Sequence, residues 1–282
     1  MSSNTLTQSV GNRTALAAIL ATGLLASASQ AVIAITDSSV PFDFSSRPVA
    51  ADWSTTNTGA AFNGTASSFP QRAQAYQNFA QMDAGIATIG AADIVQRLND
   101  AGDTSTPIPT AQRARYNNVR NTIETRPTQN RATVFMGRFQ NQSGMAQGGV
   151  DISYNMFFDT EPNTGAEQLP GWRVYASFTG DVGSFQPIPE LGGLPANSGD
   201  LRTASVAAPN GVWNDMAPFF LLFVDDNVHA SYQRDVNGVD ARDNGLWLSG
   251  LTTQSTPVVV PEPASVMILG LGALAFGIRR KR

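Results

Sequence analysis

The chain has 282 residues, of which 42% are hydrophobic and 14% are charged, and its formal net charge is −4. Four of the 18 basic residues are the last four, so the rest of the chain is acidic without a basic stripe, which argues against nucleic acid as a partner. The absence of cysteine excludes disulfides, thiolate metal sites and a cysteine nucleophile.

Residues 1–31 have the three-part layout of a secretory signal peptide. Arg13 precedes an apolar run from Thr14 to Leu25, and Ser29-Gln30-Ala31 places small residues where a signal peptidase cuts. The run is shorter than the roughly 20 apolar residues that span a bilayer, so we expect cleavage rather than an uncleaved anchor. We predict cleavage after Ala31, with Ala26-Ser27-Ala28 as the alternative site. The Sec export machinery and signal peptidase are therefore expected partners of this chain.

The expected extracellular body comprises residues 32–257, and its segment 70–126 is predicted to be mainly helical. Residues 35–68 are rich in Ser, Thr, Ala and Asn and indicate an irregular segment, whereas 70–126 carry apolar residues at steps of three and four. The first such stripe comprises Tyr76, Phe79, Met82, Ile86 and Ile89. A later helix, capped by Thr110, is expected to bury Tyr116, Val119 and Ile123.

Residues 130–251 are predicted to be mainly β-structure, because the period of the apolar residues changes to two. The expected strands are Val150 to Met156, Trp172 to Ser177, Phe219 to Val224, Val228 to Gln233 and Gly245 to Leu251. Residues 252–257 are expected to be a tether. The predicted fold class is therefore α+β, a helical N-terminal part followed by an antiparallel β-rich sandwich or curled sheet.

No catalytic site is evident in the body. The one histidine, His229, alternates with apolar residues on its predicted strand and has no G-x-S-x-G sequence with it, so we expect it on the polar surface. Two carboxylates could support glycoside hydrolysis, and the candidate pairs are Asp159 with Glu161 and Asp225 with Asp226. Adjacent acids are more typical of solvated turns, so we predict that the protein is not an enzyme.

One polar loop is a candidate calcium site. It contains Asp235, Asn237, Asp240 and Asp243. Oxygen ligands at such spacing suit calcium, although the bidentate acid and flanking helices of an EF-hand are absent. A polar hairpin loop with an Asn-Gly turn is the competing interpretation. Apart from calcium, no cofactor is expected.

Residues 258–282 combine three features in order. Pro261-Glu262-Pro263 follows three valines, residues 264–278 are apolar, and the basic residues Arg279, Arg280, Lys281 and Arg282 come last. As a helix, 264–278 rises about 22 Å against a hydrocarbon core of roughly 30 Å, which predicts a marginal C-terminal transmembrane helix. Basic residues stay on the cytoplasmic side, so the body is expected outside, as the N-terminal signal also predicts.

This tripeptide, apolar span and basic cluster together resemble the PEP-CTERM sorting signal, and the resemblance is confined to about residues 258–282. It implies that Pro261, Glu262 and Pro263 are read by a membrane-embedded exosortase, for which the chain is a substrate and not a catalyst. It also implies a host that makes extracellular polysaccharide or biofilm. A tail anchor that is never processed is the alternative.

We therefore expect an exported protein that is anchored in the inner membrane before processing and is then at the cell surface, secreted, or in the extracellular matrix. Its expected role is non-catalytic, either structural or in interaction with polysaccharide or biofilm. Two alternatives stay open. One is a glycan- or calcium-dependent adhesive module, and the other is a secreted hydrolase with a carboxylate pair.

Overall fold

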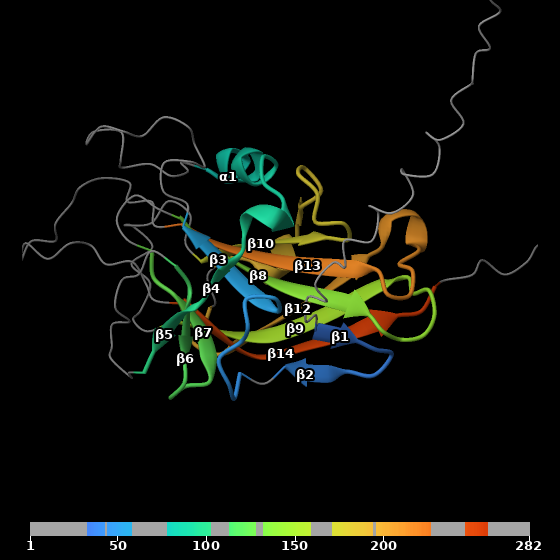
Figure 1. The fold of residues 1–282 in the computed structure, drawn as a ribbon. Helices are drawn as coiled ribbons and strands as arrows, with labels where there is room; N and C mark the ends of the chain where they lie inside the picture. Colours follow the sequence, from blue (N-terminus) through green and yellow to red (C-terminus); the bar gives the residue numbers. More distant parts are fainter. Residues whose placement is uncertain are drawn as a thin grey trace, which may run out of the picture. The chain divides into compact units, whose positions relative to one another are not determined.

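Two β-sheets form most of the described part of the protein (Figure 1). The computed structural model describes residues 33–42, 44–57, 78–102, 113–127, 132–158, 171–193, 196–226 and 246–258. All of them belong to one unit of the chain. These residues include one α-helix and three short 3-10 helices, namely α1 (Phe79–Ile86), η2 (Ala91–Asp93), η3 (Pro189–Leu191) and η4 (Pro209–Gly211).

Within the described residues, each sheet contains seven strands. The first sheet has the order β11 (Gln186–Pro187), β10 (Trp172–Ser177), β13 (Pro218–Asp226), β8 (Ala132–Asn141), β3 (Trp53–Asn57), β4 (Gln96–Arg97), and β1 (Ile33–Ile35) pairs with β8. The second has the order β12 (Asp200–Ala207), β9 (Gly149–Phe158), β14 (Leu246–Thr256), β7 (Thr122–Thr125), β6 (Arg115–Asn117), β5 (Asn99–Ala101), and β2 (Val40–Phe42) pairs with β14. The pairs β1 with β8 and β5 with β6 are parallel. The long strands pair antiparallel.

The inner faces of the two sheets share one hydrophobic core. The rings of Phe135 in β8 and Phe223 in β13 stack with centroids 4.6 Å apart, and Tyr154 of β9 meets Phe223 edge to face at 5.5 Å. Such aromatic pairs contribute about 0.5–1.5 kcal/mol beyond the area that they bury. Successive residues of β9 alternate between this core and the outer face, as the period of two predicts.

A second hydrophobic cluster covers the outer face of the first sheet. Met82 and Ile86 of α1 pack there with Met136 of β8 and Leu222 of β13. Because β8 and β13 face a core on both sides, nearly all of their described side chains are buried. In β13 this gives a continuous apolar run from Phe219 to Val224, which is the pattern of a central strand, whereas β8 also buries Thr133 and Arg138. The helix therefore serves to bury one face of this sheet.

A charged cluster fixes α1 to the first sheet. Asp83 of α1 accepts hydrogen bonds of 2.7 Å from both Nε and Nη2 of Arg173 in β10, and one of 2.8 Å from the hydroxyl of Tyr175. Burial, the largest single effect, pushes the pKa of Asp83 up, but the hydrogen bonds from Arg173 and Tyr175 and the Arg173 charge together lower it. The carboxylate therefore stays ionised and holds the helix in place.

The predicted α+β fold class, with a mainly helical segment over residues 70–126, is wrong. Of that segment, the described part forms α1, η2 and then β4, β5, β6 and β7. Met82 and Ile86 are buried as the helical stripe predicts. The helix predicted from the spacing of Tyr116, Val119 and Ile123 does not form. Tyr116 belongs to β6 and Ile123 to β7, and Val119 lies in the turn between these strands.

That turn has a local cause in the sequence. Asn117 Oδ1 accepts hydrogen bonds from the backbone N–H of Val119 and Arg120 at 2.9 and 3.1 Å, and Asn121 has a φ of 54°. Asparagine favours both features, so the asparagines around Val119 are turn signals that compete with helical spacing. Val119 is 55% exposed at this turn and does not face a core.

Two other segments are more ordered than expected. The stretch 35–68 contains β2 and β3, and Trp53 of β3 is fully buried at the centre of the main core. The segment 252–257 is not a separate tether, because β14 continues to Thr256 and pairs with Gly149 of β9.

Within the described ranges, none of the helices has the length and apolar character needed to cross a membrane. The expected transmembrane helix 264–278 and the signal peptide 1–31 lie outside those ranges.

Candidate functional site

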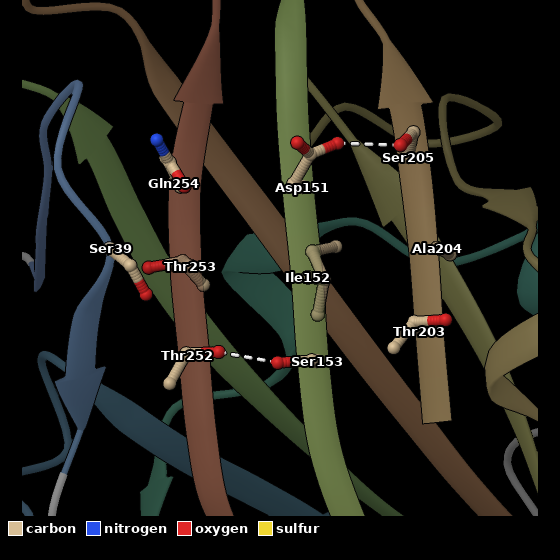
Figure 2. A pocket seen from close by; sticks show the side chains of 10 residues that line it. All are labelled: Ser39, Asp151, Ile152, Ser153, Thr203, Ala204, Ser205, Thr252, Thr253 and Gln254. Carbon is tan, nitrogen blue, oxygen red and sulfur yellow. Dashed lines mark hydrogen bonds between the residues drawn. The ribbon is translucent and has the colours of Figure 1, made fainter. Parts of the chain in front are cut away.

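A groove lies on the outer face of the second sheet, between β12, β9 and β14 (Figure 2). It has a volume of about 400 Å³. Its lining consists of Ser39, Asp151, Ile152, Ser153, Thr203, Ala204, Ser205, Thr252, Thr253 and Gln254.

The strand register aligns the outward side chains of the groove in rows. Asp151 of β9 lies between Ser205 of β12 and Gln254 of β14. The next row, two residues along each strand, consists of Thr203, Ser153 and Thr252. Because every second residue of a strand faces the same side, the two rows make one continuous polar surface.

Hydrogen bonds hold these side chains in place. The Ser205 hydroxyl donates to Asp151 Oδ1 at 2.5 Å, and the hydroxyls of Ser153 and Thr252 lie 2.5 Å apart (Figure 2). The amide of Gln254 donates to the carbonyl of Asp37 at 2.8 Å. Side chains that are already positioned lose less conformational entropy when a ligand binds. The groove is therefore a preformed surface of donors and acceptors.

Hydroxyl groups dominate the chemistry of the groove, and Asp151 is the one acid among the ten lining residues. A hydroxyl both donates and accepts, and a carboxylate accepts, so the surface can match the hydroxyl groups of a sugar in either sense. Hydrolysis of a glycosidic bond by the usual mechanism requires two carboxylates. The lining residues therefore supply groups for binding but not the pair needed for that reaction.

Further along the same face, an aromatic row follows the polar rows. The register places Phe157 of β9, Trp247 of β14 and Glu124 of β7 side by side. The rings of Phe157 and Trp247 are parallel with centroids 5.5 Å apart, and the guanidinium carbon of Arg120 lies 5.0 Å from the Trp247 centroid. This cation–π contact gives the partly exposed aromatic pair a fixed orientation.

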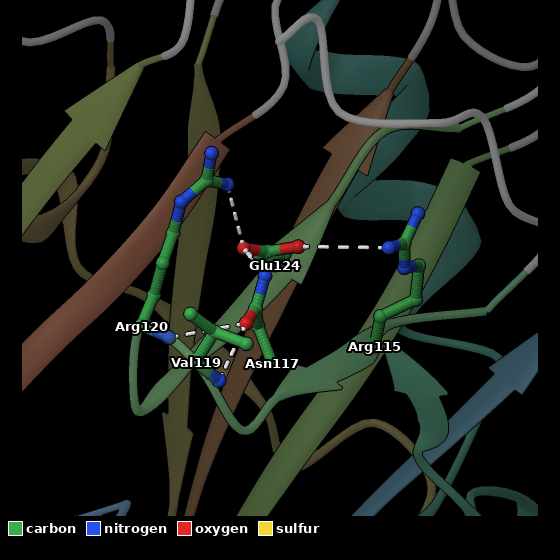
Figure 3. Close-up of polar contacts among 5 residues, drawn as sticks. All are labelled: Arg115, Asn117, Val119, Arg120 and Glu124. Carbon is green, nitrogen blue, oxygen red and sulfur yellow. Dashed lines mark hydrogen bonds and ion pairs between the residues drawn. The ribbon is translucent and has the colours of Figure 1, made fainter. Parts of the chain in front are cut away.

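Glu124 anchors the turn that carries Arg120 (Figure 3). Its Oε1 accepts hydrogen bonds of 2.7 Å from Asn117 Nδ2 and 2.9 Å from Arg120 Nη1, and Arg115 Nη2 lies 3.9 Å from Oε2. Burial is the largest effect and raises the pKa of Glu124, while the hydrogen bonds from Arg120 and Asn117 oppose that shift. The cluster connects β6 and β7 with the aromatic row and is a structural support for this end of the face.

Most side chains that the sequence identifies as candidates lie outside the described residues. They are Asp159, Glu161, His229, the calcium candidates Asp235, Asn237, Asp240 and Asp243, the motif Pro261, Glu262 and Pro263, and the basic cluster Arg279, Arg280, Lys281 and Arg282. In the part of the chain that is described, no three His, Cys, Asp or Glu side chains gather as metal ligands would.

Asp225 is the one nominated acid whose side chain is described. It belongs to β13, opposite Trp172 of β10 and Thr133 of β8, and is only 5% exposed. The sequence places it in a solvated connection, whereas the strand extends through Asp226. Asp225 is therefore part of the fold and does not belong to the groove.

No pattern in the sequence predicts the groove. The alternation from Val150 to Met156 correctly predicts that Asp151 and Ser153 face outward. On β14, the residues that face inward beside the groove are Thr253 and Ser255, which are not apolar, so no alternating pattern is visible. The sequence feature that favours continuation of the strand is the β-branched character of Thr252, Thr253 and Thr256.

The comparisons with known proteins locate one family motif. Residues 259–282 match the family model of the PEP-CTERM protein-sorting motif. This confirms the resemblance of the C-terminal segment. A search of curated proteins finds no match to the chain.

Solved structures show only remote likenesses. The enzymatically active domain of tailspike protein 4 of bacteriophage CBA120 matches with a TM-score of 0.28 and 11% identity over 48% of this chain and 15% of its own. A module named TmCBM61, in complex with beta-1,4-galactotriose, matches with a TM-score of 0.26 and 5% identity over 48% and 70%. A family 29 carbohydrate-binding module complexed with mannohexaose has a TM-score of 0.24 and 12% identity over 49% and 72%. These TM-scores are too low to bear on the function of this chain.

The matched residues include the Pro-Glu-Pro sequence, the apolar stretch after it and the basic cluster at residues 279–282. The chain is therefore an exported protein that carries a PEP-CTERM sorting motif over residues 259–282.

Proposed function

We propose that the body is a non-catalytic, glycan-binding surface protein, and that the groove on the second sheet binds a neutral polysaccharide. The observation that carries this proposal is the pair of aligned polar rows across β12, β9 and β14, with hydrogen bonds that position Ser205, Asp151, Ser153 and Thr252. An extended face of hydroxyl groups suits a chain of sugars, each of which offers several hydroxyls.

The charge of the face favours a neutral glycan over an acidic one. Asp151 is exposed in the groove, and no Lys or Arg is among the ten lining residues. A uronic acid or sulfated sugar would bring a like charge to Asp151 without a cation to offset it. We therefore expect selectivity against acidic polysaccharides.

Delivery and processing belong to the same proposal. The Sec machinery and signal peptidase export the chain, residues 264–278 hold it in the inner membrane, and an exosortase then processes the Pro261-Glu262-Pro263 region. The matched motif supports this order of events. The mature mass in cells with and without the exosortase tests it, because retention of residues 258–282 in both would contradict processing.

Binding by the groove is tested with a blocking variant. Thr203→Trp fills the groove from an exposed position of β12, whereas Val95→Trp adds the same bulk at a position that is 59% exposed next to the first sheet. The full-length protein is titrated calorimetrically with neutral polysaccharides of glucose, galactose and mannose. We expect Thr203→Trp to abolish binding and Val95→Trp to retain it.

A second variant tests the polar contacts themselves. Asp151→Ala removes the carboxylate and the partner of Ser205, and we expect it to weaken binding about tenfold, equivalent to 1.4 kcal/mol. Equal affinity of the wild type and Thr203→Trp, or no binding of any neutral polysaccharide by the wild type, would contradict the proposal.

A further inference from the structure

Three large apolar side chains are exposed at one end of the two sheets. Met145 is 63% exposed, Met216 is 57% exposed and Val212 is 46% exposed. They belong to the loop between β8 and β9 and the loop between β12 and β13. In Figure 1, both loops lie at the end of the sheets where β14 finishes. We call these three side chains the apolar tip.

Hydrogen bonds join the two loops into one surface. The buried side chain of Asn141 donates to the carbonyls of Met145 and Trp213 at 2.9 and 3.0 Å, and its backbone carbonyl accepts from the N–H of Met216 at 2.8 Å. Gly144 also donates to Asp215 Oδ1 at 3.1 Å. The apolar tip is therefore a fixed feature of the fold.

The backbone of Met216 is strained. Its φ is 61°, in the left-handed region that side chains other than glycine rarely adopt. A residue held there usually costs about 1–3 kcal/mol, and such outliers are more common at functional positions. Here the strained residue presents an apolar side chain to the outside instead of burying it.

The chain leaves the body at this same end. The N–H of Gly148 donates to the carbonyl of Thr256 at 2.6 Å, and β14 pairs with β9 up to Thr256 and Gly149. Only residues 259–263 separate Val258 from the apolar stretch that begins at Ala264. Fully extended, such a connection spans at most about 20 Å.

We propose that the apolar tip rests in the interface of the lipid bilayer while residues 264–278 are still in the membrane. The short connection keeps this end of the body next to the bilayer, and the apolar side chains then gain by leaving water for the boundary of headgroups and acyl chains. The nearby Asp215 favours zwitterionic over anionic lipid. The contact depends on the membrane insertion of residues 264–278 but not on glycan binding.

Because the chain has no cysteine, single cysteines can report the depth of each position. Met145→Cys and Met216→Cys are labelled with an environment-sensitive fluorophore in the full-length protein, which is reconstituted in phosphatidylcholine nanodiscs. The matched control is Leu201→Cys, because Leu201 is 64% exposed and lies six residues along β12 from Ala207, about 20 Å from the end of that strand.

The readout is quenching of the fluorophore by brominated phosphatidylcholine. We expect quenching several-fold stronger at positions 145 and 216 than at 201, with blue-shifted emission. The Met145 variant keeps the test valid if the strained Met216 position does not accept cysteine. Equal quenching at all three positions overturns the proposal, as does failure of the chain to insert into the discs. A blue shift without quenching also overturns it, because protein and not lipid then covers the tip.

Discussion

The outer faces of the two sheets differ although both sheets share one core. The first sheet presents Met136 and Leu222 outward, and α1 covers them. The second presents rows of hydroxyl side chains on β12, β9 and β14. A sheet that is apolar on both faces must bury both, whereas a sheet with one polar face is free to offer it to a ligand. The contrast supports a mainly structural role for the first sheet and is the basis for the recognition that we propose for the second.

The largest expected effect comes from removing a side chain of the covered face. Leu222→Ala leaves a cavity under α1, and we expect it to lower the free energy of unfolding by about 2–5 kcal/mol. Thr203→Ala, on the polar face, should change it by less than about 0.5 kcal/mol. Unfolding of the full-length variants by guanidinium chloride in detergent, monitored by tryptophan fluorescence, measures both changes in the free energy of unfolding. Similar losses for the two variants would remove the distinction between the faces.

A smaller effect is expected where the helix is fixed to the first sheet. Asp83→Asn removes the charge that faces Arg173, and its cost should be about 1 kcal/mol after allowance for solvent screening. Because the pKa of Asp83 is lowered in the folded state, its contribution is present above its unfolded pKa of about 4 and is lost as the pH falls through the folded value. The stability difference between wild type and variant should therefore disappear in acid. A difference that grows in acid would contradict this role.

The opposite pH dependence is expected on the second sheet, with the smallest amplitude. Burial raises the pKa of Glu124, so the folded state prefers the protonated form. Its favourable contribution is then present below the unfolded pKa of roughly 4.3 and declines as the pH rises through the folded value. The free energy of unfolding of the wild type, measured relative to that of Glu124→Gln from pH 4 to pH 7, should fall as the pH rises. The reverse trend would show that the arginines dominate the site.

The sequence predicts the parts of the fold where side-chain chemistry and burial agree. β9 and β13 are examples, because alternation marks one and a continuous apolar run marks the other. It fails where tertiary contacts decide. Tyr116 and Ile123 have helical spacing but are buried from two strands, and Thr253 and Ser255 are polar but face inward. The groove combines three strands that are distant in sequence, so no local pattern contains it.

The position of β14 affects the order in which the body can fold during export. This last described strand lies inside the second sheet, where it pairs with β9 on one side and with β7 and β2 on the other. The strands of the first sheet all precede it in the chain. If the chain emerges from its N-terminus, the first sheet can assemble while the second lacks its middle strand, and pairing over such sequence distances is slow. The groove is then completed only after β14 has emerged, immediately before the sorting motif at residues 259–282.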